Sequence, residues 1–275
     1  MLLFYGTPKP ILIMLNLILI FLYLKSRKVR TLLIGFAAFM ITIWVINDVR
    51  LIGKSSKAES DFSVLYWNMA RGKETSVKLI SEKIESLNPD IIGLVEAENI
   101  DATSFSKYQT QPYNYTFKKI SSDMLVGTKK EIIEIINSDS DHFYKYGKIK
   151  IKIKSKIYTL YIVDIFANRP YFRERVLDSL YKNIDLENNN IVMGDFNTPY
   201  ESIYLNTFRK SFWNAERKAG SGFIATWPSN YRLIQIDHIW SSKNVVPVFS
   251  NNESTSISDH SMLFTKFKMT NPPKK

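Results

Sequence analysis

The sequence contains no cysteine, so disulfides and thiolate metal sites are excluded and the redox compartment stays open. Histidine is scarce, because only His142, His238 and His260 occur, and this argues against a histidine-rich zinc site. The GxSxG, HExxH and GxxxxGK motifs of other enzyme classes are also missing. No internal repeat or low-complexity tract is found among the 275 residues. Any chemistry must therefore rest mainly on carboxylates and amides.

The N-terminal region differs in character from the rest of the chain. Ile11 to Leu24 is apolar apart from Asn16, and Thr31 to Ile46 is a second apolar stretch. Each stretch is somewhat shorter than the roughly 20 residues of a bilayer core, so flanking residues must contribute. We expect transmembrane helices at about 9–24 and 31–48, forming a membrane anchor over residues 1–50, followed by a linker at 51–60. A cleaved signal peptide and a buried helical hairpin are the alternatives.

The basic segment between the two apolar stretches predicts their orientation. Four of its six residues, 25–30, are Lys or Arg, and Lys9 is the only charged residue before the first stretch. The positive-inside rule places this segment in the cytoplasm and both chain ends outside, with the following domain extracytoplasmic. Three cations after the second stretch, Arg50, Lys54 and Lys57, count against this orientation.

The net charge of +11 is unevenly distributed. Residues 1–57 contain eight Lys or Arg against one Asp, and the tail adds four lysines, whereas residues 58–265 hold 25 basic and 25 acidic residues. Basic residues beside an anchor suit an anionic membrane surface. They are poor evidence for a nucleic-acid-binding face on the neutral middle of the chain.

Five short polar motifs follow one another from residue 67 onward, each within or after an apolar, β-branched run. They supply four carboxylates, two amides and a histidine. Oxygen donors of this kind suit a hard divalent cation and an activated water that attacks phosphorus. The motifs are Trp67-Asn68, Val95-Glu96, Gly194-Asp195-Phe196-Asn197, Ile236-Asp237-His238 and Ser258-Asp259-His260.

These motifs resemble the pattern of the endonuclease/exonuclease/phosphatase superfamily, the group with the DNase I-like fold. The resemblance spans about Asp61 to Phe267 and includes Thr198-Pro199 and Thr226-Trp227-Pro228. It implies an α+β four-layer sandwich, with two packed β-sheets flanked by helices, over residues 61–268. Two transmembrane helices would precede this domain and a disordered tail, 269–275, would follow it. It also implies a phosphoric ester hydrolase that uses Mg²⁺, with Mn²⁺ as a substitute.

Three of the motif residues are candidate metal ligands. Glu96 is the leading candidate, Asn68 would add a neutral oxygen, and Asp259 would bind the ion directly or through water. The alternatives are that Asn68 caps a turn and that Glu96 is an ordinary surface carboxylate.

The other motif residues are candidate catalytic groups. By resemblance, Asp195 would orient or deprotonate the attacking water, and Asn197 would hold that water or a phosphate oxygen. His260 would donate a hydrogen bond to the phosphate, while Asp237 would pair with its other nitrogen and raise its pKa. A purely local Asx-turn is the alternative for the Asp195–Asn197 segment. His238 is interpreted as structural.

One departure from the family pattern concerns residues 161–170. Many relatives carry a histidine there, whereas this chain has none. Asp164, Asn168 and Arg169 are candidates to take its place, the last two as substrate-binding residues. The identity of the general acid stays open.

The apolar runs predict buried strands near residues 62–67, 90–95 and 191–193, and a helix near 77–87. Residues 147–165 predict a β-hairpin in which Lys148, Lys150, Lys152 and Lys154 alternate with isoleucines. This cationic stripe is interpreted as a solvated outer face, with binding of phosphates or anionic lipid as the alternative.

The function that the sequence favours is a membrane-anchored, metal-dependent hydrolase of phosphodiesters, with nucleic acid as the first substrate class. Its partners would be that substrate and the lipid bilayer, with no obligate protein partner. A phospholipid or sphingomyelin head-group hydrolase or phosphatase is the alternative. A catalytically weakened, membrane-bound binding module is a third interpretation, which the missing histidine supports.

Overall fold

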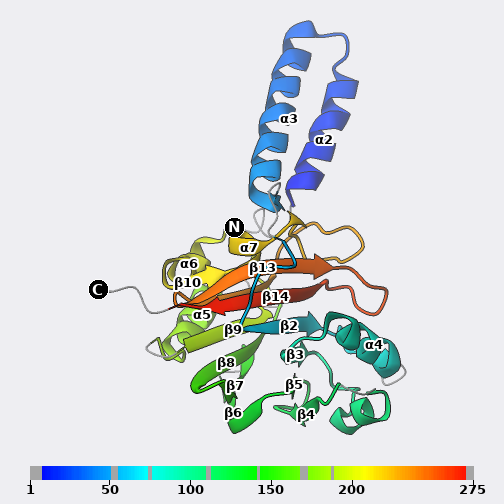
Figure 1. The fold of residues 1–275 in the computed structure, drawn as a ribbon. Helices are drawn as coiled ribbons and strands as arrows, with labels where there is room; N and C mark the ends of the chain where they lie inside the picture. Colours follow the sequence, from blue (N-terminus) through cyan, green and yellow to red (C-terminus); the bar gives the residue numbers. More distant parts are fainter. Residues whose placement is uncertain are drawn as a thin grey trace.

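The computed structural model describes residues 8–50, 55–73, 76–109, 113–140, 143–167, 173–186 and 189–270. Two long helices project together from one side of a body built from two β-sheets (Figure 1). They are α2 (Lys9–Leu22) and α3 (Arg27–Asp48), and they lie side by side. The chain therefore consists of a helical projection and a sandwich, as the change in composition near residue 57 predicts.

Among the described residues, α3 alone has the length and composition to cross a membrane. It contains 22 residues, and just 6% of its most apolar window is buried. The 14 residues of α2 fall short of the roughly 20 that a bilayer core requires. The basic residues Arg27, Lys28 and Arg30 belong to the first turn of α3 rather than to a connecting loop, because the helix already begins at Arg27.

Each sheet of the sandwich has six strands. The first sheet has the order β10-β12-β9-β8-β7-β6, and the second has the order β13-β14-β2-β3-β5-β4. The strands of the first sheet are β6 (Glu131–Ser140), β7 (Tyr144–Ile153), β8 (Lys156–Ile165), β9 (Asn189–Asp195), β10 (Phe212–Asn214) and β12 (Asp237–Ser242). Those of the second are β2 (Phe62–Asn68), β3 (Ile91–Val95), β4 (Thr116–Lys119), β5 (Leu125–Thr128), β13 (Val245–Glu253) and β14 (Met262–Met269).

Helices cover the outer face of each sheet. The two sheets share an apolar core in which Val64 of β2 and Ile162 of β8 are fully buried. Helix α4 (Val77–Leu87) packs on the outside of the second sheet, and α5 (Arg173–Lys182) packs on the outside of the first. Central strands are buried on both faces, which explains their continuous apolar runs. The prediction of an α+β fold with two packed sheets flanked by helices is confirmed.

Smaller elements connect these layers. They are the 3₁₀ helices η2 (Ala102–Lys107) and η4 (Ile203–Leu205), the short helices α6 (Asn206–Ser211) and α7 (Ala215–Ala219), and the two-residue strands β1 (Val49–Arg50) and β11 (Gly222–Phe223). Strand β14 continues to Met269, whose N–H donates to Asp61 at 2.8 Å, so the predicted tail begins later than residue 269. Residues 271–275 lie outside the described residues.

The predicted hairpin is formed by β7 and β8, and its lysines face a strand that the sequence did not reveal. Lys150 pairs with Glu134 at 2.7 Å, and Lys152 with Glu131 at 3.3 Å, across the β6–β7 ladder. Cross-strand ion pairs of this kind are typical of a solvated outer face. With Lys154 bound to Asp61, three of the four lysines of the stripe are paired with carboxylates.

The base of the helical projection is joined to the sandwich by hydrogen bonds and charge. Strand β1, directly after α3, pairs with β11, and the Asp48 carbonyl accepts from Ile224 N–H at 3.0 Å. Asp48 is buried and binds Lys9 at 2.7 Å, while Lys9 also lies 3.6 Å from Glu201. The helices and the sandwich are thus in direct contact.

Candidate active site

The polar motifs meet where strands of both sheets end. Asn68 is the last residue of β2, and Glu96 follows β3, its parallel neighbour. In the other sheet Asp195 ends β9, where it is the register partner of Asp164 on β8 and of Asp237 on β12. Strand pairing therefore places three aspartates side by side in one sheet, facing the end of the other.

Asn68 links the two sheets. Its fully buried amide donates from Nδ2 to Glu96 Oε1 at 3.0 Å and to Asp195 Oδ2 at 3.1 Å. Its side-chain oxygen, Oδ1, accepts from the Ala70 N–H at 2.8 Å. In this arrangement Asn68 orients two carboxylates through its amide hydrogens and turns its oxygen toward the backbone.

His260 and Asp237 form a buried pair. Nδ1 of His260 donates to Asp237 Oδ2 at 2.9 Å, and Tyr66 Oη donates to Asp237 Oδ1 at 3.3 Å. Burial alone would lower the pKa of His260, but the carboxylates, led by Asp237, raise it to about 10. The imidazole is therefore charged at neutral pH. Its Nε2 lies 3.9 Å from Oδ2 of Asp195.

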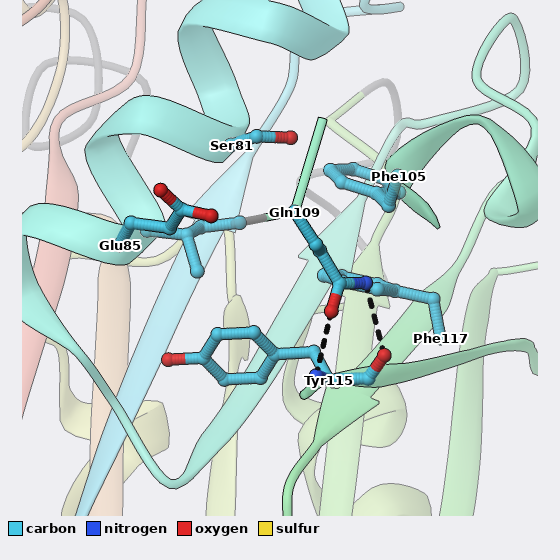
Figure 2. A pocket seen from close by; sticks show the side chains of 7 residues that line it. Ser81, Glu85, Phe105, Gln109, Tyr115 and Phe117 are labelled. Carbon is cyan, nitrogen blue, oxygen red and sulfur yellow. Dashed lines mark hydrogen bonds between the residues drawn. The ribbon is translucent and has the colours of Figure 1, made fainter. Parts of the chain in front are cut away.

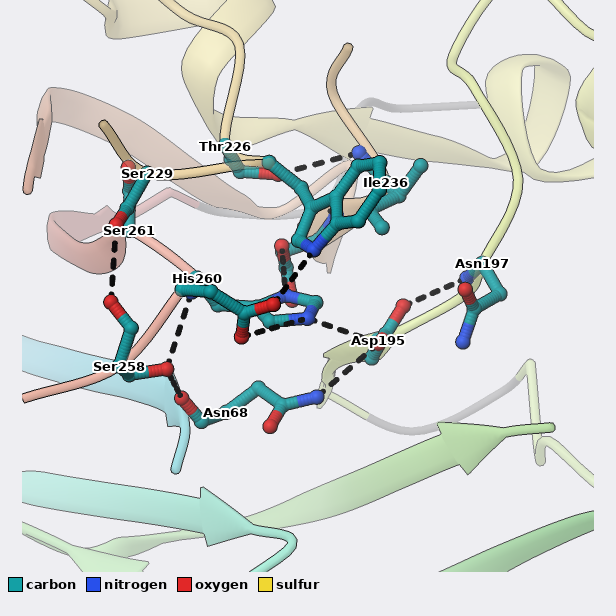
Figure 3. A network of polar contacts seen from close by, with 12 residues as sticks. Asn68, Asp195, Asn197, Thr226, Ser229, Ile236, Ser258, His260 and Ser261 are labelled. Carbon is teal, nitrogen blue, oxygen red and sulfur yellow. Dashed lines mark hydrogen bonds and ion pairs between the residues drawn. The ribbon is translucent and has the colours of Figure 1, made fainter. Parts of the chain in front are cut away.

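The turn after β9 holds Asp195 in place. The Asn197 N–H donates to Asp195 Oδ1 at 2.7 Å (Figure 3). The Asn197 side chain donates to the Ile165 carbonyl at 2.7 Å. Asn197 has a φ of 44°, a left-handed conformation that costs energy outside glycine. Burial, and then the nearby charge of Asp237, raise the pKa of Asp195 well above its usual range.

The Ser258-Asp259-His260 loop closes the site over Asn68. Ser258 Oγ donates to the backbone carbonyl of Asn68 at 2.7 Å and accepts from the His260 backbone N–H at 3.0 Å (Figure 3). The Asp259 side chain is 57% exposed and accepts from Trp227 Nε1 at 3.1 Å. Asp259 thus lies at the rim of the site, 3.9 Å from Nε2 of His260, and not in the inner group of carboxylates.

Among the described residues, two groups of side chains have ligand atoms close enough together to hold a cation. Glu96, Asp164 and Asp195 offer oxygens within 4.8 Å of one another, and Asp195, Asp237 and His260 form a second group. In the second group Nδ1 of His260 is bonded to Asp237, which favours an ion pair there. The first group consists of oxygen donors alone, the ligands that Mg²⁺ and Mn²⁺ prefer. The residues present therefore fit such an ion.

Residues 65–260 match the family model described as "Endonuclease/Exonuclease/phosphatase family". The chain belongs to this family. Its members are metal-dependent hydrolases that act on phosphoesters. No curated protein matches the chain.

Solved structures of the same fold agree with the family. A Bacteroides thetaiotaomicron family protein is 13% identical with a TM-score of 0.62, covering 76% of this chain and 98% of the other. Humanized D. rerio TDP2 is 13% identical with a TM-score of 0.61, covering 76% and 99%. Truncated Caenorhabditis elegans TDP2 is 17% identical with a TM-score of 0.59, covering 75% and 97%. At these identities the similarity shows the fold.

His238 belongs to the Ile236-Asp237-His238 motif but to neither group of possible metal ligands. Asn168 and Arg169 lie outside the described residues. His238 is fully buried, its Nε2 donating to the Thr198 carbonyl at 2.9 Å and its Nδ1 facing the Asn214 amide at 3.4 Å. Burial lowers the pKa of His238 to about 4, so the ring is neutral at physiological pH and packs under the turn after Asn197.

A separate hollow lies between α4, η2 and β4 and shares no residue with the site. Figure 2 shows Gln109 bridging it, with its side chain donating to the Tyr115 carbonyl and accepting from the Tyr115 N–H. Phe105 and Phe117 stack beside it, with ring centroids 4.0 Å apart. This hollow is packed by aromatic rings and contains none of the motif residues.

Proposed function

We propose that this chain is a membrane-anchored, divalent-metal-dependent phosphodiesterase whose first substrate class is nucleic acid. The observation that carries the proposal is the convergence of Asn68, Glu96, Asp195, Asp237 and His260 in one buried cluster. Carboxylates for a hard cation and a charged imidazole beside a candidate base are the groups that phosphoester hydrolysis needs.

In this proposal Asp195 positions and deprotonates the attacking water. Its carboxylate is oriented from two sides, by the Asn197 N–H and by the Asn68 amide, so one arrangement is favoured. The raised pKa makes the carboxylate a stronger base than an exposed aspartate. Asn197, whose side chain is fixed by its bond to the Ile165 carbonyl, would hold this water or a phosphate oxygen.

His260 stabilises the developing negative charge on the phosphoryl oxygens. Asp237 binds Nδ1, fixes the ring plane and keeps the imidazole charged, so that Nε2–H is available to the substrate. When bound, Mg²⁺, or Mn²⁺ in its place, would supply charge neutralisation on the non-bridging oxygens. Glu96 is the principal ligand in this proposal, and Asp259 at the rim would act through water.

The membrane location is part of the proposal. Helix α3 can cross a bilayer by length and composition, and its apolar side chains are almost wholly uncovered, unlike those of a core helix of a soluble protein. We infer that α2 also crosses the bilayer, with residues that flank the helix adding to the length of its span. Arg27, Lys28 and Arg30 at the start of α3 would remain cytoplasmic, which places the sandwich outside the cytoplasm.

The close docking of the anchor favours a second candidate, hydrolysis of a phospholipid or sphingomyelin head group. The β1–β11 pairing and the Lys9–Asp48 ion pair hold the sandwich against the base of α2 and α3. A domain held this way stays near the head groups of the lipid layer.

The test uses the full-length chain purified in detergent. We expect bis(p-nitrophenyl) phosphate to be hydrolysed with Mg²⁺ or Mn²⁺ and not with EDTA. Asp195→Ala and His260→Ala should each lower kcat by about 100- to 10,000-fold. Parallel assays with single-stranded DNA, duplex DNA and liposomes of phosphatidylcholine or sphingomyelin separate the two substrate classes. Failure on every phosphoester with metal present would leave the binding module as the better interpretation.

A further inference from the structure

Asp164 occupies a place in the site that the family motifs leave unassigned. It lies one residue before the end of β8 and is the register partner of Asp195 on parallel β9. Asp195 is in turn the partner of Asp237 on β12. Backbone pairing therefore fixes Asp164 at the same level of the sheet as the two motif aspartates.

The Asp164 carboxylate is buried without a hydrogen-bond donor from the described residues. Asp164 is only 5% exposed. Lys145 is its cross-strand partner on β7, but the Lys145 ammonium binds Asp123 Oδ2 at 2.6 Å. The side-chain NH₂ group of Asn68 donates to Glu96 and Asp195 and not to Asp164. A buried carboxylate is costly, and the nearby charges of Lys145 and His260 offset only part of this cost.

The surroundings of Asp164 increase that cost. Its oxygen lies within 4.8 Å of carboxylate oxygens of Glu96 and Asp195, so three acidic groups face one another. Carboxylate oxygens this close together could share one divalent cation, which Glu96, Asp164 and Asp195 would hold.

We propose that Asp164 is a direct ligand of the divalent cation, sharing it with Glu96 beside Asp195. The inference rests on the proposed function, because it assigns a further ligand to the same metal site. It explains why a carboxylate is retained inside an apolar strand, between Val163 and Ile165, where any neutral side chain would be less costly.

The proposal predicts that Asp164→Asn weakens Mn²⁺ binding but does not destabilise the metal-free chain. Without metal, the variant removes one of three mutually repelling carboxylates, so the melting temperature in EDTA should be unchanged or higher. With metal, the variant lacks a ligand, so the Kd for Mn²⁺ should rise by at least about tenfold. The stabilisation that Mn²⁺ gives to the wild-type chain should shrink accordingly.

The experiment measures both effects on the full-length chain in detergent. Free Mn²⁺ is followed by electron paramagnetic resonance during titration, and unfolding is followed with Mn²⁺ or EDTA. Asp61→Asn is the matched control, because Asp61 is a carboxylate bound to Lys154 outside the site. It should keep the wild-type Kd. Asp164→Ala provides a second variant in case the asparagine form does not fold.

The outcomes separate this inference from the proposed function. Wild-type Mn²⁺ affinity in both Asp164 variants, with catalysis intact in the wild type, would overturn the ligand assignment alone. A lower melting temperature in EDTA with an unchanged Kd would show a structural role and would also overturn it. A wild-type chain that neither binds Mn²⁺ nor hydrolyses phosphoesters would overturn both proposals.

Discussion

His260 and Asp237 are held together inside the site, with Nδ1 of the imidazole 2.9 Å from Oδ2 of the carboxylate. They come from different parts of the sandwich, since Asp237 begins β12 of one sheet and His260 lies in the loop before β14 of the other. Burial opposes charge on the ring, yet the carboxylates around it keep it protonated. The pair therefore supplies a positive charge that persists well above neutral pH.

Asp237→Asn should lower activity and should move the alkaline limit of activity to lower pH. Without the largest charge that raises the pKa of His260, the pKa falls from about 10 and the ring loses its proton at a lower pH. We expect kcat/KM to fall about 100-fold or more at pH 7, with its alkaline limb shifted to lower pH. The measurement is a pH–rate profile from pH 6 to 10 with bis(p-nitrophenyl) phosphate. An alkaline limb in the same position as in the wild type would contradict this role of the pair.

Asn68→Ala should weaken metal binding at the site more than it weakens folding. The variant removes the amide that holds Glu96 and Asp195 at 3.0 and 3.1 Å, so the two carboxylates separate. We expect the Mg²⁺ concentration for half-maximal activity to rise about tenfold, with a loss in kcat. Asn99→Ala, which removes an exposed amide bound to the Arg71 carbonyl, is the control. Equal Mg²⁺ curves for the two variants would rule out the orienting role.

The strands that carry the motifs were predictable, because β2, β3 and β9 are buried on both faces and therefore appear as continuous apolar runs. Strand β6 was not, since its edge position leaves an exposed face with Glu131 and Glu134. The pairing of β1 with β11 joins two residues across more than 170 positions, and no local pattern reveals it.

The chemistry of the site was less predictable than its members. The motif pattern identified Asn68, Asp195, Asp237 and His260, and they do meet. The direction of the Asn68 amide depends on the Ala70 N–H, a contact that the motif does not contain. The sequence named Asp164 only as a candidate to replace the missing histidine and not as a metal ligand. Its register with Asp195 is a property of the sheet.

The full-length chain should behave as an integral membrane protein. We expect it to stay in the membrane pellet after washing with alkaline carbonate and to leave it only with detergent, because the apolar side chains of α3 are almost wholly uncovered. Two reporters fused after Lys275 test the orientation. One that is active only outside the cytoplasm should be active, and one that is active only in the cytoplasm should be inactive. Release of the chain by carbonate, or the reverse reporter pattern, would contradict the anchor or its orientation respectively.

Glu216 should make stability fall as pH rises through the weakly acidic range. The side chain is fully buried near Gln235 and Ser250, each at 3.4 Å, and burial raises its pKa from 4.5 to about 7. The folded state thus keeps the proton while the unfolded state releases it, so the stabilisation present below pH 4.5 is lost between pH 4.5 and 7. The loss is on the order of 3 kcal/mol, or several degrees in melting temperature. Glu216→Gln, which stays neutral, should show a flatter dependence when melting temperatures are compared at pH 5 and 8. A variant whose melting temperature falls over this interval as steeply as that of the wild type would show that another group is responsible.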